Sequence, residues 1–498
     1  MPNGAKTTNS PSHHITGVRL AAKNTLVFGA MRVAQYLLLF GFTVLAARRL
    51  GVRDFGILTF GLSLTALIGV TADAGLGRLV NREVARDRTR INAIVNNSLS
   101  AKAALSVVSL LLLIAATKLL GYPATTRQVV YVLGISMVFF SFEMFFEGVF
   151  KGVERMEYQA YAVTTDKLLT FLVGVGLLLA GKGLIAVAFA FVIARLLSMT
   201  VALAVYGRKL ARPRFAAVWK EISWLMREAW PFAIFALLGM SYLQLDTILL
   251  AQLKGSDSVG VYQAAVRLVL VLMIIPEAVS EAVFPGMSRL FHSSRERLNL
   301  VYQNCLRLML VTGLPLTVAL LVLAERIIVP IYGTPFAGAV LLVKITALMV
   351  VPRFLAHVPG TLLTAVDQQH RRTAAAGLCV LVSLAANLLL IPAAGAAGAA
   401  IASVITNMTL LGTYAALARR EGFRGMSLPD VIKPLAATAA MGIFLHFLRA
   451  WNLVLIVPAA VAVYLFALYL LGAISTDDRE ILRQCLARPT QADPEVCA

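Results

Sequence analysis

Long apolar runs, separated by short polar segments, occupy almost the whole chain. About 20 apolar residues in a helix cross the hydrocarbon layer of a bilayer, and most of these runs reach that length. The pattern predicts an all-α polytopic membrane protein with about fourteen transmembrane helices. The predicted spans are 26–47, 55–79, 99–120, 128–150, 162–180, 184–206, 231–252, 259–285, 306–324, 340–365, 374–393, 396–417, 435–448 and 453–474.

An internal repeat divides the first twelve spans into two halves. The segment 45–58 matches 249–262 at a constant offset of 204 residues, which pairs Gly51 with Gly255 and Gly56 with Gly260. Each copy is the turn between the first two spans of its half. Six spans separate the copies, so both have the same orientation in the membrane. Parallel repeats of this kind place a substrate site between the halves.

The longest connection joins these halves. Between Arg214 and Trp230 apolar residues recur on one face of a helix, which predicts an amphipathic helix in the membrane interface. The predicted organisation is then an N-terminal segment, an N-lobe of six spans, a linker, a C-lobe of six spans, two further spans and a tail. Their ranges are 1–25, 26–206, 207–230, 231–418, 419–474 and 475–498.

Composition supports a membrane protein and makes nucleic acid an improbable partner. The 498 residues are 59% hydrophobic and 14% charged, and the mean hydropathy is +0.81. The net charge of +20 is spread over short loops rather than gathered on one basic face. No cofactor site, metal-ligand set or catalytic site is predicted from the spacing of the polar residues.

Loop charge predicts the orientation. With the N-terminus in the cytoplasm, the inside segments carry about three times as many Lys and Arg residues as the outside loops. We therefore expect both termini to be cytoplasmic. Arg48, Arg49 and Arg53 are the exception, because they fall in an outside loop.

Four arginines lie inside predicted spans, at Arg32, Arg195, Arg267 and Arg353. A charge at membrane depth costs several kcal/mol, so it usually faces a polar path through the protein rather than lipid. Each arginine has a structural alternative, because it can also satisfy helix-end carbonyls or a buried acid.

Acids are distributed differently. Most of them lie near the cytoplasmic ends of spans, where Glu147 precedes Lys151 by one turn and Asp166 adjoins Lys167, so we expect structural pairs there. Asp246 is the exception, since it lies nearer the outside. Two interpretations stay open for it: a binding site for a coupling ion, or a structural pair with Arg267 on the next span.

The repeat segments also carry a family resemblance. Residues 48–58, 246–267, 331–339 and 392–400 resemble the polysaccharide-transporter family, the O-antigen and capsule repeat-unit flippases of the MOP superfamily. The resemblance covers nearly the whole chain and implies a MATE-like fold. It also implies a flippase of the bacterial inner membrane, which moves an undecaprenyl-diphosphate-linked oligosaccharide to the outer leaflet by alternating access.

In that setting the four arginines gain a specific role. Guanidinium stays charged and forms two-pronged contacts with phosphate, so Arg32, Arg195, Arg267 and Arg353 are candidates to bind the diphosphate. Expected partners are the lipid-linked oligosaccharide, membrane lipids and polysaccharide polymerase or assembly proteins.

Three other functions are alternatives for a chain of this kind. A lipid II flippase differs only in the group carried by the lipid. A multidrug exporter of the same fold carries organic cations, for which acids and aromatics suit better than deep arginines. A membrane glycosyltransferase, polymerase or ligase needs a sizeable polar loop to assemble its catalytic site, and the outside loops here are short.

Overall fold

The computed structural model describes residues 11–448 and 451–472, with side chains from residue 33 onward. Residues 1–10, the predicted tail 475–498 and the side chain of Arg32 lie outside the described residues. Throughout the described ranges the regular elements are helical. The α-helices are α1 Pro11–Asp73, α2 Leu76–Arg86, α3 Ile91–Leu119, α4 Ala124–Gly152, α5 Met156–Leu179, α6 Leu184–Lys209, α7 Trp219–Leu272, α8 Ile274–Ser293, α9 Arg295–Tyr332, α10 Ala339–Ala347, α11 Val350–Ala365, α12 Gln369–Arg420, α13 Leu428–Phe447 and α14 Leu453–Leu470. Short 3₁₀ turns cover Arg88–Arg90 and Thr334–Phe336.

Eleven helical stretches in the described part are long and apolar enough to cross a membrane. Three of them are broken at a glycine, α1 at Gly51, α7 at Gly255 and α12 at Gly395. All three glycines have positive φ, a conformation that a residue with a side chain rarely adopts. Counting the two parts of each broken helix separately gives fourteen segments, which confirms the predicted all-α fold of about fourteen spans.

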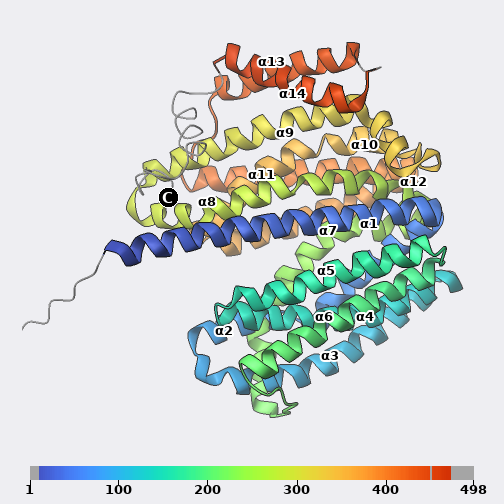
Figure 1. Ribbon diagram of the computed structural model, residues 1–498, viewed down its shortest axis with the longest axis vertical. Helices are drawn as coiled ribbons and strands as arrows, with labels where there is room; N and C mark the ends of the chain where they lie inside the picture. Colours follow the sequence, from blue (N-terminus) through green and yellow to red (C-terminus); the bar gives the residue numbers. More distant parts are fainter. Residues whose placement is uncertain (1–10, 449–450, 473–498) are drawn as a thin grey trace, which may run out of the picture.

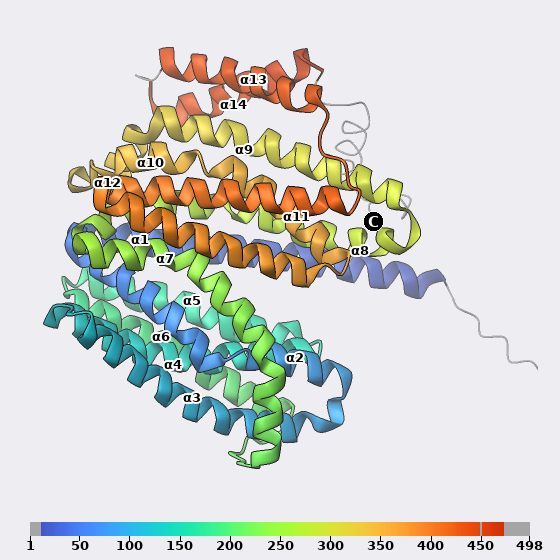
Figure 2. The same ribbon diagram turned by 180° about the vertical axis from the view of Figure 1, so that it is seen from behind.

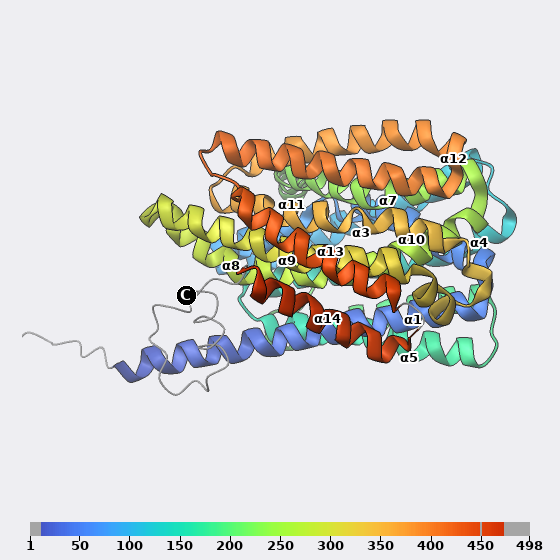
Figure 3. The same cartoon turned by 90° about the horizontal axis from the view of Figure 1, so that it is seen from above.

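The helices form two groups, with α1 and α7 between them (Figure 1). Helices α2 to α6 make one group and α8 to α12 the other, and α7 runs from the first into the second (Figure 2). Helices α13 and α14 lie at the far side, where Met441 and Tyr464 pack against Leu323 of α9. Seen from above, most helices share one general direction, as in a bundle that crosses one bilayer (Figure 3).

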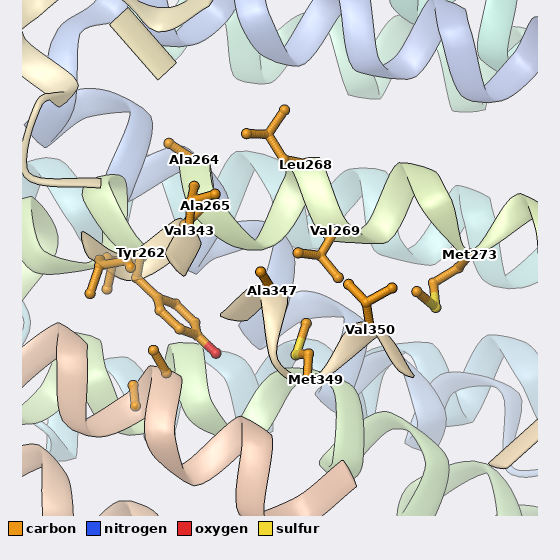
Figure 4. Close-up of a cluster of buried hydrophobic side chains, with 14 of the residues drawn as sticks. Tyr262, Ala264, Ala265, Leu268, Val269, Met273, Val343, Ala347, Met349 and Val350 are labelled. Carbon is orange, nitrogen blue, oxygen red and sulfur yellow. The ribbon is translucent and has the colours of Figure 1, made fainter. Parts of the chain in front are cut away.

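Two predicted spans are interrupted halfway. Span 259–285 breaks at Met273, between α7 and α8, and span 340–365 breaks at Met349, between α10 and α11. Both methionines are buried where the second part of α7 packs on α10 and α11 (Figure 4). Both methionines keep right-handed helical dihedrals, so each interruption is a tight turn within the span rather than an unwound segment.

The structure corrects the predicted linker in one respect. The amphipathic segment is not a separate helix, because α7 begins at Trp219 and continues without a break through Pro231. Part of its apolar face packs on the first group of helices, since Leu225 and Ala229 are fully buried there. Trp219 and Trp230 remain exposed. The segment is therefore fixed to the protein on one side rather than lying free in the interface.

We name the two ends of the bundle by these features. The glycine end contains Gly51, Gly255 and Gly395, and the linker end contains residues 207–218. At the glycine end the side chain of Arg48 donates to the carbonyls of Pro330 and Ile331, the last turn of α9. This contact gives a structural reason for the basic residue that the loop-charge rule left unexplained, because a cation is favourable at a helix C-terminus.

Candidate functional site

Two adjoining cavities lie within the bundle and share Arg267 as a wall. The larger cavity, of about 280 Å³, lies between the first part of α1 and helices α7, α8, α11 and α12. The smaller cavity, of about 170 Å³, lies between α1, α5 and α6. Leu39 and Thr43 of α1 also line both, so the two cavities together extend from the first group of helices to the second.

Arg267 is held at this junction without a partner. Among the described residues it makes no hydrogen bond or ion pair, and its Nε atom is buried and unsatisfied. A buried guanidinium without a counter-charge is costly, and an anion placed against it removes that cost. The junction of the cavities is therefore suited to an anionic group.

Two more of the predicted arginines line the same cavities. Arg353 lies in the wall of the larger cavity, with its guanidinium 5.8 Å from the ring centre of Tyr242. Arg195 lines the smaller cavity. Its Nη1 donates to Ser136 Oγ at 3.0 Å, and its guanidinium lies 4.4 Å from the ring centre of Phe140. The structure thus brings together three arginines that are far apart in the sequence.

The acids near the smaller cavity form the expected local pairs. Asp166 contacts Lys167 at 2.7 Å and Glu147 contacts Lys151 at 3.9 Å. In the larger cavity Glu277 accepts a hydrogen bond of 2.8 Å from Tyr36. None of these three carboxylates forms an ion pair with Arg195, Arg267 or Arg353, although Asp166 lies within electrostatic range of Arg195.

Asp246 is surrounded by neutral donors in the wall of the larger cavity. One carboxylate oxygen accepts from Asn387 at 2.7 Å and from Ser383 at 3.3 Å. The other accepts from Ser403 at 2.6 Å and from Tyr262 at 3.0 Å. In the described part of the chain there is no ion pair between Asp246 and Arg267. One further oxygen, Oδ1 of Asn387, is buried beside this carboxylate without a hydrogen-bond partner.

Sequence reasoning missed the partners of Asp246. Ser383 and Asn387 are one helical turn apart in the first part of α12, and Ser403 and Asn407 repeat that spacing in the second part. Polar residues at this spacing in an otherwise apolar span were a usable signal, because each pair marks one face of its helix. The sequence alone does not show that these two faces of α12 both contact α7.

Comparisons with known proteins agree with this architecture. The family model described as "Polysaccharide biosynthesis protein" matches residues 21–291, more than half of the chain, and one described as "MatE" matches residues 231–389. The chain is 26% identical to "Probable flippase AglR" of Haloferax volcanii over 436 residues, which cover 85% of this chain and 86% of that protein.

Solved structures share the fold. The lipid II flippase MurJ in an inward closed conformation matches with a TM-score of 0.75 at 13% identity, covering 92% of this chain and 100% of that one. An inward-facing multidrug transporter of the MATE family, MOP superfamily, matches with a TM-score of 0.63 at 13% identity, covering 78% of this chain and 94% of that one. The predicted MATE-like fold is confirmed.

Proposed function

Because the chain belongs to the polysaccharide biosynthesis protein family, we propose that it is a flippase for a lipid-linked glycan. The observation that carries this proposal is the unpaired Arg267 at the junction of two cavities, with Arg195 and Arg353 in their walls. The phosphate or diphosphate that joins the lipid to the sugar is the strongly anionic group of a lipid-linked glycan. The name of the similar protein AglR supports the same function.

In the finer form of the proposal, the substrate is an undecaprenyl-diphosphate-linked repeat unit of O-antigen, capsule or exopolysaccharide. Arg32, Arg195, Arg267 and Arg353 bind the diphosphate, and the sugars occupy the remaining polar part of the cavities. Arginine suits this task because its planar fork contacts two phosphate oxygens at once. The glycan then crosses the membrane inside the protein, while the lipid chain stays in the bilayer.

The transport cycle that we propose is a rocking of two lobes, residues 26–206 and 231–418, around the cavities. The linker end faces the cytoplasm of a bacterial cell and both termini lie on that side. The loop charges support this orientation. Parallel halves that meet at a central site support the rocking motion.

Asp246 is the proposed site of a coupling cation. Its carboxylate, the hydroxyls of Ser383 and Ser403, and the unpartnered Asn387 Oδ1 together offer several oxygen ligands, which is what a hard cation such as Na⁺ binds. The repeat provides an internal contrast, since Phe42 occupies the equivalent position in the first half. Only the second half therefore offers this ligand set.

Export of organic cations is the main competing function within this fold. It fits the cavities less well, because Arg267 and Arg353 offset the charges of Asp246 and Glu277 in the larger cavity, which leaves no excess of acids to attract a large organic cation. A lipid II flippase keeps the diphosphate and differs in the attached group.

Reconstitution tests the proposal. The purified protein, placed in liposomes, is offered a fluorescent polyprenyl-diphosphate oligosaccharide, fluorescent lipid II or ethidium. We expect the oligosaccharide lipid to reach the opposite leaflet faster than in protein-free liposomes. Transport of ethidium without movement of either lipid would contradict the proposal, and movement of lipid II alone would change its substrate.

A further inference from the structure

The two cavities differ in the charges of their walls. Among the described residues, the smaller cavity is lined by three cations and one acid, Asp166. The larger cavity is lined by two arginines, Arg267 and Arg353, and by two acids, Asp246 and Glu277. The excess of positive charge therefore lies on the side of the smaller cavity. A diphosphate on the shared Arg267 is stabilised from that side rather than from the larger cavity.

A diphosphate on Arg267 changes the balance of charge in the larger cavity. Arg267 is then neutralised by the ligand, and the described wall keeps one arginine, Arg353, against the two acids Asp246 and Glu277. Such a wall repels a second anionic group. The part of the substrate that enters the larger cavity is therefore expected to be uncharged.

Glu277 offers an acceptor to this cavity. Its Oε2 accepts a hydrogen bond of 2.8 Å from the hydroxyl of Tyr36, which lies on α1 across the cavity. Its Oε1 accepts no hydrogen bond from the described residues and is not buried. An ionised carboxylate can only accept, so it needs donors such as O–H groups. A sugar supplies O–H groups, whereas an ionised phosphate does not.

Two amides in the same wall have unused hydrogen-bonding groups. Gln244, in the first part of α7, makes no hydrogen bond within the described part of the chain, and Gln263, in the second part, uses only its Nε2, which donates to Thr247. An amide both donates and accepts, as a hydroxyl group does. The rings of Tyr36 and Tyr242 add apolar surface to the wall. Convergent polar groups beside apolar surface are typical of a small-molecule site.

The position of Glu277 fits a group attached to the phosphate. Arg267 and Glu277 are ten residues apart, on either side of the turn at Met273, which is roughly 15 Å of helix. Both line the larger cavity, with Glu277 on the linker side of Arg267. A head group whose phosphate lies on Arg267 can therefore extend along this cavity as far as Glu277.

We propose that the larger cavity is a sugar site, which binds the sugar attached to the diphosphate and selects an uncharged sugar over an acidic one. This inference rests on the proposed function. Glu277, Gln244 and Gln263 bind hydroxyl groups of the sugar. Glu277 and Asp246 repel a sugar that carries a carboxylate, such as a uronic acid.

Binding to the full-length protein in detergent tests the sugar site, measured by isothermal titration calorimetry. The probes are farnesyl diphosphate and its conjugates with glucose, N-acetylglucosamine or glucuronic acid. In wild type at least one neutral conjugate should bind about tenfold more tightly than farnesyl diphosphate, because a hydrogen bond to a charged group contributes that much. The glucuronic acid conjugate should bind no more tightly than farnesyl diphosphate.

Glu277→Gln removes the charge and nearly keeps the shape of the side chain. It should weaken binding of that neutral conjugate about fivefold and bring the acidic conjugate to within about twofold of it. Farnesyl diphosphate should bind no more weakly than to wild type, because it has no sugar. Glu296→Gln changes an exposed acid in the first turn of α9 and is the matched control. It should behave as wild type with every probe.

Two further variants cover an unstable Glu277→Gln protein. Glu277→Asp keeps the charge and should still discriminate against the acidic conjugate. Gln244→Leu removes only neutral hydrogen-bonding groups, so it should weaken the neutral conjugate and leave farnesyl diphosphate binding unchanged.

Equal binding of neutral and acidic conjugates to wild type would overturn the sugar site, as would unchanged affinities in both Glu277→Gln and Gln244→Leu. These outcomes leave the proposed function standing if the protein still moves a lipid-linked glycan in liposomes. A wild-type protein that binds the neutral conjugate with this preference but moves no lipid-linked glycan would instead remove the proposed function.

Discussion

Gly56 and Gly260 occupy equivalent positions of the internal repeat, and each lies against the backbone of the opposite half. A Cβ atom on Gly56 would lie 1.9 Å from the carbonyl oxygen of Ser256, and one on Gly260 would lie 2.1 Å from that of Val52. Val52 and Ser256 are themselves equivalent positions. The contact is therefore reciprocal, as expected for two related halves that meet around a pseudo-twofold axis.

The first prediction concerns this crossing. Gly56→Ala forces the two halves apart at the glycine end, because the added methyl has no space beside the Ser256 carbonyl. We expect a loss of about 1–3 kcal/mol for closure of that end. Cysteines at Val52 and Ser256 should then be bridged several-fold more slowly by a short bifunctional reagent. Gly239→Ala, on the open side of α7, is the control, and an unchanged bridging rate in Gly56→Ala would contradict the prediction.

The same cysteine pair tests whether the two lobes must separate. A bridge between Val52→Cys and Ser256→Cys ties α1 to α7 at the glycine end, so transport should stop if the proposed rocking opens that end. A reducing agent should restore transport when the bridge is a disulfide. Normal transport in protein shown by mass spectrometry to be fully cross-linked would rule out rocking at this interface.

Orientation is open to a direct test. If the linker end is cytoplasmic, a cysteine placed at Ser256 or Ser258 should react with a membrane-impermeant maleimide added to intact cells. A cysteine in residues 208–214 should react only after the cells are opened. The reverse pattern would invert the proposed topology.

A fourth prediction concerns the coupling cation. Asp246→Asn removes the negative charge and replaces one ligand oxygen with an amide nitrogen, which cannot bind a cation. Glycan transport should lose its dependence on the ion gradient, measured in liposomes with and without imposed Na⁺ or proton gradients. Asp257→Asn, an exposed acid on the same helix, should behave as wild type. If Asp246→Asn keeps the gradient dependence of wild type, the carboxylate is a structural residue.

Some features of this protein could be predicted from the sequence, and others could not. The spans and the repeat were predictable from local patterns, because the length of an apolar run and the position of a turn glycine can be read from neighbouring residues in the sequence. The deep arginines were also recognisable, because Arg195, Arg267 and Arg353 interrupt apolar runs. The cavities that they share depend on how helices distant in the sequence pack together, and no local sequence pattern indicates that packing.

The remaining features depend on contacts between distant residues. The linker was expected to lie in the membrane interface because its apolar face is visible in the sequence, whereas the protein surface that covers Leu225 and Ala229 is not. The candidate site was therefore predictable in its chemistry and only partly in its geometry.

The most direct test of the central claim is the rate of glycan delivery by variants of Arg267. Arg267→Lys keeps the positive charge but loses the two-pronged contact of the guanidinium, and Arg267→Ala loses both. The delivery rate should therefore fall from wild type to the Lys variant to the Ala variant, with the rate of the Ala variant about tenfold below that of wild type. The measurement is the amount of lipid-linked sugar reaching the outer leaflet of cells that lack their own flippase, normalised to protein in the membrane. Lys118→Ala, an exposed cation of α3, should equal wild type. Full delivery by both Arg267→Ala and Arg32→Ala would show that these arginines do not bind the substrate.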